Sequence, residues 1–214
     1  MNQALFVVLE GIDGAGTTTQ AGLLARSLRA RNVPVAETRQ PSDGPVGMLI
    51  RQMLRRRIVP PSGSGLPSWR ELGLLFAADR LDHLEADVLP RLESGVTVVC
   101  DRYDYSSIAY QSAAADSAEA VAWLRELNRY ARRPDLTLVL DVSAEQASAR
   151  RSVRAGPEEI FDDDPFQARL ATFYADIDRH FPGDRIQHVA GDLDVPSVAA
   201  EVLGAVCSLG GTSR

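Results

Sequence analysis

A glycine-rich segment near the N-terminus constrains the fold of this chain more than any other feature. The segment Gly11–Gln20 reads GIDGAGTTTQ and follows the apolar run 5–9, which is typical of a parallel strand covered on both faces. Glycine allows positive φ and close backbone approach, and we expect a helix over Thr17–Leu28 whose free N–H groups point at an anion. The segment therefore predicts a phosphate-binding loop. The plainer alternative is a strand-to-helix turn that binds nothing.

The spacing of this segment is that of a P-loop, but Thr17 stands where the motif requires lysine. All 23 basic residues of the chain are arginine, so the cation that faces a bound nucleotide is a guanidinium, a metal ion or neither. Thr18 occupies the position whose hydroxyl coordinates Mg²⁺, and Thr19 can bond a neighbouring phosphate oxygen. The residues expected to hold the nucleotide are consecutive: Gly11, Ile12, Asp13, Gly14, Ala15, Gly16, Thr17, Thr18 and Thr19.

Length and composition favour one α/β domain. The 214 residues contain no Pro/Gly/Ser-rich linker, so we expect a single domain over 1–214, with a flexible loop at 60–67 and a disordered tail at 210–214. The net charge of −6 argues against a nucleic-acid or membrane-surface partner, because such binders need a basic footprint. No signal-like N-terminus and no apolar run of about 18 residues is seen, and we expect a cytoplasmic protein.

Further strand patterns follow the first one along the chain. They lie at 34–38, 96–100, 136–140 and 186–189. Segments of helical periodicity separate them, and this alternation predicts an α/β fold with a five-stranded parallel sheet and helices on both faces. In such a sheet, ligands bind at the carboxyl ends of the strands. The charged motifs described next lie at those ends.

Asp101 and Arg102 directly follow the strand predicted at 96–100. Beside a P-loop, an aspartate at a strand's carboxyl end can hold Mg²⁺, directly or through water, and the adjacent arginine can clamp a second phosphate bidentately. The alternative is that the two residues form an ion pair that caps the next helix.

Phe76 and Arg80 are four residues apart in a predicted helix and therefore share a face. A ring and a guanidinium side by side suit a nucleobase, since one can stack on it and the other can bond its carbonyl edge. The alternative is that Phe76 belongs to the core and that Arg80 snorkels from it to solvent.

Together these segments resemble the thymidylate kinase family of P-loop nucleoside monophosphate kinases over nearly the whole chain. The most specific motifs are EGIDG at 10–14, TRQP at 38–41, LFAADR at 75–80, DRY at 101–103 with SSIAYQ at 106–111, and RPDLTLVLD at 133–141. The resemblance implies the fold of these kinases with a mobile lid, and transfer of the γ-phosphoryl group of ATP, with Mg²⁺, to dTMP to give dTDP. It also implies a homodimer, since dimers are usual in this family.

The resemblance implies a base pocket that lies outside the P-loop. Phe76 would stack on thymine, and Arg80 would bond it. Ser106 and Gln111 would line the rest of the pocket.

The resemblance likewise implies roles at the sugar and phosphates. Tyr110 would crowd the 2′ carbon and so select deoxyribose, and Asp13 would lie near the 3′-hydroxyl. Arg39 and Arg102 would hold the acceptor phosphate. Asp101, with the P-loop threonine, is the candidate for the metal.

The lid of the family is expected at about 150–166, where a mobile segment closes over the donor and excludes water. In the bacterial type that lacks a P-loop arginine, as this chain does, the lid supplies catalytic arginines, and Arg150 and Arg154 are the candidates. We interpret the acidic run 162–164 as a solvated helix start. The run Arg55–Arg57 reads as a solvated helix end rather than a phosphate site.

The missing lysine leaves alternatives open. Removing one preorganised charged donor costs on the order of 3–4 kcal/mol of transition-state stabilisation unless another group covers the same oxygens. The chain would then be a non-catalytic or weakly active nucleotide-binding protein on the same fold. A further alternative is a kinase for another nucleoside monophosphate, since fold does not fix substrate. The acceptor motifs are intact, and for that reason we favour an active thymidylate kinase.

Overall fold

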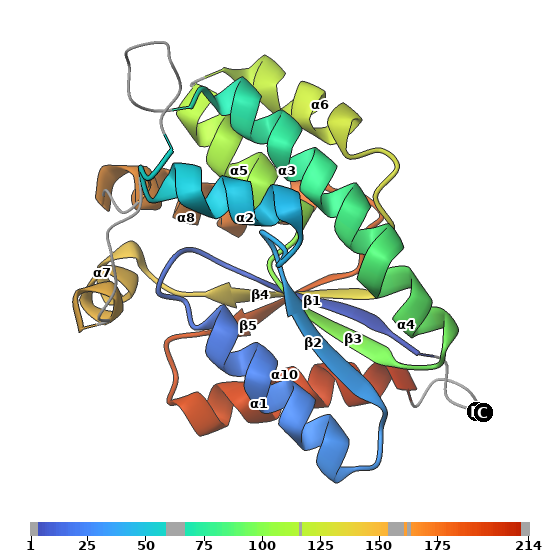
Figure 1. Cartoon of the computed structure of the whole chain (residues 1–214). Coiled ribbons are helices and arrows are strands. Elements are labelled where there is room, and N and C mark those ends of the chain that lie inside the picture. The colour runs from blue at the N-terminus through green and yellow to red at the C-terminus, as the bar shows by residue number, and fades with distance from the viewer. Residues whose placement is uncertain (1–3, 59–66, 116, 154–160, 162–163, 211–214) are drawn as a thin grey trace.

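The computed structural model describes residues 4–58, 67–115, 117–153, 161 and 164–210. A five-stranded, all-parallel sheet of order β2-β3-β1-β4-β5 forms the centre of the molecule (Figure 1). Its strands are β1 Phe6–Glu10, β2 Val35–Arg39, β3 Thr97–Asp101, β4 Leu136–Asp141 and β5 Ile186–Ala190. The predicted sheet is confirmed, and each strand begins and ends within one residue of its expected bounds.

The central strand β1 is buried along its whole length. It pairs with β3 on one side and β4 on the other, so that Val7 lies between Val99 and Leu136. Burying such a side chain contributes roughly 1.5–3 kcal/mol, which explains why the strand is a continuous apolar run. Because β1 is central, the glycine-rich loop that follows it lies at the middle of the sheet's carboxyl edge.

Helices cover both faces of the sheet, as predicted (Figure 1). On one face lie α1 Thr17–Ala30 and α10 Val195–Gly210. The other face carries α2 Pro45–Leu54, α3 Trp69–His83, α5 Asp104–Ala115, α6 Ala118–Leu127 and α8 Asp164–Ala175. Shorter or peripheral elements are the π-helix η1 Leu84–Val88, α4 Leu89–Glu93, α7 Ala144–Val153 and α9 Ile177–His180.

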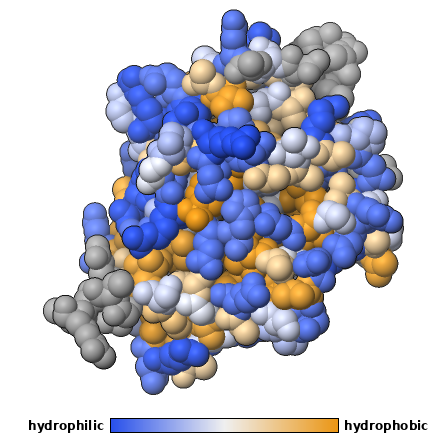
Figure 2. All heavy atoms as spheres, turned by 180° about the vertical axis from the view of Figure 1, so that it is seen from behind, coloured by the Kyte–Doolittle hydropathy of each residue, from blue (hydrophilic) through white to orange (hydrophobic). Residues whose placement is uncertain are grey.

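The surface mixes polar and apolar residues. Figure 2 shows hydrophobic side chains in small groups between hydrophilic ones on the back of the molecule. Among the described helices, none is both long and apolar enough to cross a membrane. α2 ends at Leu54, and Arg55–Arg57 are exposed after it. The loop expected at 60–67 lies almost entirely outside the described residues, as do residues 211–214 of the expected tail.

Candidate active site

The loop after β1 has the geometry of a phosphate cradle. Gly14 and Gly16 adopt φ angles of 94° and 98°, which residues with a side chain rarely adopt. A Cβ at Gly14 would lie 2.5 Å from the carbonyl oxygen of Ala147, whereas a Cβ at Gly16 would meet nothing within 4 Å. The backbone beside Gly16 is thus open to a ligand at the N-terminus of α1, where unpaired N–H groups favour an anion.

A cavity of about 920 Å³, the donor cavity, opens over this loop. Residues 13–20 form its floor, and Arg150 and Val153 of α7 border it. Leu193, in the loop that joins β5 to α10, and Val195, the first residue of α10, also line it. These two side chains are 42% and 51% exposed, so they offer an apolar surface at the rim on which a planar base can pack.

Thr18, which lines the donor cavity, contacts Asp101 at the carboxyl end of β3. The Thr18 hydroxyl donates a hydrogen bond to Oδ2 of Asp101. The other carboxylate oxygen, Oδ1, is buried and has no hydrogen-bond partner among the described residues. Hydroxyl and carboxylate oxygens are ligands that Mg²⁺ accepts, and this ion takes its remaining ligands from water and phosphates. The pair therefore fits the predicted magnesium site.

Arg102 connects the P-loop to the rest of the site. Its φ of 69° lies in the left-handed region, which costs a non-glycine residue about 1–3 kcal/mol and is common at functional sites. The guanidinium donates to the Gly11 carbonyl at 2.8 Å and to Oδ1 of Asp13 at 2.6 Å. Arg102 therefore pairs with Asp13, and the alternative in which Asp101 and Arg102 pair as a helix cap does not hold.

Glu10 supports the turn that carries Arg102. Its fully buried carboxylate accepts hydrogen bonds from the Tyr103 N–H at 2.7 Å, the Ser106 hydroxyl at 2.5 Å and the Tyr174 hydroxyl at 2.8 Å. Burial raises the pKa of Glu10, whereas Arg102 and these hydrogen bonds oppose the rise. The Ser106 hydroxyl also accepts a hydrogen bond from Arg102 at 3.0 Å. The sequence motif contained Glu10, but its spacing does not reveal that the side chain points into the core.

A second cavity of about 370 Å³, the acceptor cavity, also borders the Asp13–Arg102 pair. The arginines that line it are Arg39, Arg51, Arg55 and Arg102. Arg39 and Arg51 both reach Oδ1 of Asp43, at 2.8 and 3.1 Å. This concentration of guanidinium groups suits a phosphate. Sequence reasoning missed Arg51, because one arginine in an amphipathic helix carries no local signal.

Aromatic and uncharged polar side chains also line the acceptor cavity. Phe76, Tyr110 and Gln111 are lining residues, with Ser107 beside them. Gln111 is fully buried, and neither its amide oxygen nor its amide nitrogen has a partner in the described part of the chain. The Ser107 hydroxyl is likewise buried and unpartnered there. Such groups are costly unless a ligand or water satisfies them. Ser107 was missed, although its spacing of four from Gln111 places both on one helix face.

Arg80 is fully buried and is not among the residues that line the acceptor cavity. Its guanidinium bonds the side-chain oxygen of Asn128 and lies 5.2 Å from the centroid of the Tyr103 ring. The snorkelling alternative is wrong, since no part of the side chain reaches solvent. Its Nε and one terminal nitrogen have no hydrogen-bond partner among the described residues, and both could therefore donate to a ligand. The role of Arg80 at the base stays a prediction.

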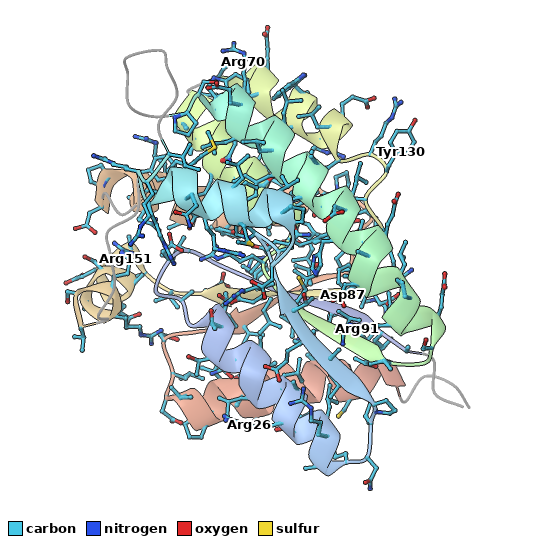
Figure 3. All side chains as sticks on the ribbon, in the orientation of Figure 1. Arg26, Arg70, Asp87, Arg91, Tyr130 and Arg151 are labelled. Atoms are coloured by element: carbon cyan, nitrogen blue, oxygen red, sulfur yellow. The ribbon has the colours of Figure 1, made fainter. Side chains whose placement is uncertain are left out.

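The first residues of the predicted lid belong to the last turn of α7 and contact the P-loop. Arg150 donates to a backbone carbonyl in the β5–α10 loop at 2.9 Å. Arg151, which sequence reasoning did not single out, donates to the Asp13 carbonyl at 2.8 Å and pairs with Asp164 at 2.6 Å; Figure 3 labels it beside α7. Asp164 begins α8, in agreement with the expected helix start. The predicted lid arginine Arg154 lies outside the described residues, as do 155–160 and 162–163.

Comparison with known proteins agrees with this geometry. Residues 9–191 match the family described as thymidylate kinase. A probable thymidylate kinase of Pyrococcus abyssi is 44% identical over 72% of this chain and 73% of its own length. One from Pyrococcus horikoshii is 37% identical over 93% of this chain and 98% of its own length. A thymidylate kinase of Ruegeria pomeroyi is 37% identical over 92% of each. This chain belongs to the thymidylate kinase family.

Proposed function

We propose that this protein transfers the γ-phosphoryl group of ATP to dTMP, with Mg²⁺, and releases dTDP and ADP. The observation that carries the proposal is that Asp13 and Arg102 border both cavities. In the transfer, an oxygen of the acceptor phosphate bonds the γ-phosphorus while the bond to the β–γ bridging oxygen breaks. This step needs in-line positioning and charge compensation. The guanidinium of Arg102, at the junction of the two cavities, would help to position the acceptor phosphate and would offset its charge.

The acceptor cavity supports thymine as the base. The Gln111 amide offers a donor and an acceptor, which match the carbonyl and N–H edge of thymine. Phe76 provides an aromatic face for stacking. Tyr110 also lines this cavity, and the bulk of its ring opposes a 2′-hydroxyl. Burial raises the pKa of Tyr110 well above its usual value. Arg39 and Arg102 hold the acceptor phosphate, and Arg51 joins them.

The donor cavity supports a nucleoside triphosphate with its phosphates on the P-loop. Thr18 and Asp101 would hold Mg²⁺, which would supply positive charge to offset the charge that develops on the donor phosphates. Thr17 is only 5% exposed and brings no charge. We propose that Arg150, together with Arg154, supplies the missing cation. Arg150 would exchange its present carbonyl contact for a phosphate oxygen.

A panel assay tests this function. Purified protein with Mg-ATP is given dTMP, dCMP, dGMP or UMP, and ADP formation is measured by enzymatic coupling. We expect turnover with dTMP to exceed that with the other acceptors. Equal rates on all four acceptors contradict the base assignment. Tight dTMP and ATP binding without any turnover would instead support the non-catalytic alternative.

We further propose that the protein is a cytoplasmic homodimer. Apolar side chains are exposed on two adjoining helices: Met48 of α2 is 56% exposed, and Leu74 and Leu81 of α3 are 54% and 37% exposed. Such a patch on neighbouring helices favours association. Light scattering after gel filtration should give about twice the chain mass of 23.2 kDa, and Leu74→Arg should halve it. A wild-type mass of one chain rules out the dimer.

A further inference from the structure

Gln167 makes more contacts with the P-loop than its sequence context suggests. It lies in the first turn of α8 and is fully buried. Its amide oxygen accepts a hydrogen bond from the backbone N–H of Asp13 at 3.2 Å. Its amide nitrogen donates to Oδ2 of Asp13 at 3.2 Å and to the carbonyl of Phe161 at 2.8 Å. One side chain therefore holds both the main chain and the carboxylate of Asp13.

Every polar atom of Asp13 consequently takes part in a hydrogen bond. Gln167 bonds its N–H and Oδ2, Arg102 bonds Oδ1, and Arg151 bonds its carbonyl oxygen. Oδ2 accepts a hydrogen bond from the neutral amide of Gln167, whereas Oδ1 accepts one from the charged guanidinium of Arg102. A carboxylate oxygen can accept more than one hydrogen bond, so Oδ2 is the oxygen with capacity left for a ligand hydroxyl.

We propose that Gln167 is a positioning residue that orients the Asp13 carboxylate toward the 3′-hydroxyl of the acceptor nucleotide. The inference rests on the proposed function, in which Asp13 lies near that hydroxyl. Gln167 does not touch the reacting phosphates. It acts through Asp13, and because it also bonds Phe161, it couples the start of α8 to the P-loop.

The chemistry of the amide makes this role specific to glutamine. Both amide hydrogens are used, one on Asp13 and one on Phe161, and the oxygen faces a backbone N–H. Glutamate at this position would keep the shape and the acceptor but lose both donors, and would set a second carboxylate against Asp13. Like charges at this distance destabilise each other, and Oδ2 would turn away or become protonated.

The test compares two acceptors that differ only in the hydroxyl, dTMP and 2′,3′-dideoxythymidine monophosphate. Gln167→Glu and the apolar Gln167→Met are assayed for kcat/KM on both. We expect each variant to lower the preference for dTMP over the dideoxy acceptor at least tenfold, mainly through KM. Gln146→Glu and Gln146→Met, at an exposed glutamine of α7, are the matched controls and should leave the preference unchanged.

If Gln167 has a purely structural role, its variants lower kcat/KM equally for both acceptors and leave the preference unchanged. That result overturns the inference. We expect Asp13→Asn to abolish the preference by itself, so adding Gln167→Met should lower it no further. An additional drop in the double variant means that Gln167 does not act through Asp13. If wild-type protein fails to phosphorylate dTMP at all, the proposed function fails instead, and the two failures are distinguishable.

Discussion

The acceptor and donor cavities meet at one ion pair, yet they are built from different parts of the chain. The acceptor cavity holds about 370 Å³ between side chains, and its arginines are already oriented by carboxylates, as Arg39 is by Asp43. The donor cavity, about 920 Å³, has a floor of P-loop residues, and the backbone at Gly16 is open to it. Recognition on the acceptor side therefore depends on side chains, and on the donor side it depends chiefly on main-chain geometry.

This difference explains how a P-loop can lack its lysine without losing its shape. The cradle at Gly14 and Gly16 is set by φ angles and by the close approach of Ala147, none of which involves position 17. The lysine would add charge at the transferring phosphate, which another cation can supply. No comparable replacement exists for a guanidinium that fits between two cavities. Substitutions should therefore be most damaging on the acceptor side.

The largest effect is expected at the junction itself. Arg102→Ala should lower kcat/KM for dTMP at least about 100-fold, equivalent to about 2.7 kcal/mol of transition-state stabilisation. The reason is that it removes the clamp on the acceptor phosphate and leaves Asp13 unpaired. Arg26→Ala, on the exposed face of α1, is the matched control and should change nothing. If Arg102→Ala keeps more than about a tenth of the activity, the clamp role is wrong.

Arg80→Ala should have the next largest effect, confined to the acceptor. The KM for dTMP should rise about tenfold or more, the size of one lost charged hydrogen bond, while the KM for ATP stays within about twofold. Because Arg80 is fully buried, Arg80→Met keeps most of the volume and separates packing from hydrogen bonding. Should Arg80→Met bind dTMP as wild type does, Arg80 only packs against Tyr103 and bonds Asn128.

On the donor side, restoring the lysine should matter little. Thr17→Lys is expected to change kcat by less than about tenfold, because in the proposed mechanism Arg150 and Arg154 serve the β- and γ-phosphates and a lysine would crowd them with like charge. Arg154→Ala should lower kcat at least about tenfold. Arg150→Ala tests whether Arg150 contributes to kcat as well. A large gain from Thr17→Lys together with no loss from Arg154→Ala would mean a crippled kinase.

Much of this architecture was predictable from the sequence. The apolar run of β1 predicted a parallel strand covered on both faces, and the glycines after it predicted the phosphate-binding loop, because both are local patterns. What stayed hidden were contacts between distant residues. Gln167 lies 154 positions from Asp13. The pairing of Arg51 with Asp43 spans only eight positions, but it joins a helix to the segment before it and has no periodic sequence signal. Arg80 shares a helix face with Phe76 as predicted, but its full burial depends on Asn128, far along the chain.

The smallest expected effect is a difference between the two edges of the sheet in how their stability depends on pH. At the β2 edge, on the acceptor side, the titrating residue is His83. His83 bonds Thr38 through Nε2 at 2.6 Å and Gln40 through Nδ1 at 3.2 Å. Burial lowers the pKa of His83 below 6.5, opposed by Asp87. A lowered pKa means that the folded state disfavours the proton. This contribution to stability is therefore complete above about pH 6.5 and is lost as the pH falls below it.

At the β5 edge, on the donor side, the sign is reversed. His188 bonds both oxygens of Asp141 at 2.9 Å and Oδ2 of Asp178 at 3.1 Å. Burial works against protonation, but these carboxylates outweigh it and raise the pKa of His188 above 6.5. The stabilisation is complete below about pH 6.5 and is lost as the pH rises through the raised value. Asp141 and Asp178 are largely solvated, so solvent screening keeps it below about 1 kcal/mol.

Urea unfolding between pH 5 and pH 8 tests both edges together. His83→Gln should reduce the loss of unfolding free energy below pH 6.5 and leave the curve above pH 6.5 unchanged. His188→Gln should reduce the pH dependence of the unfolding free energy only above pH 6.5. The effect at His83 should be the larger, because its ring is 5% exposed and that of His188 is 30% exposed. If both variants alter the same limb, the two edges do not titrate in opposite directions, and the contrast between the acceptor and donor sides is confined to their cavities.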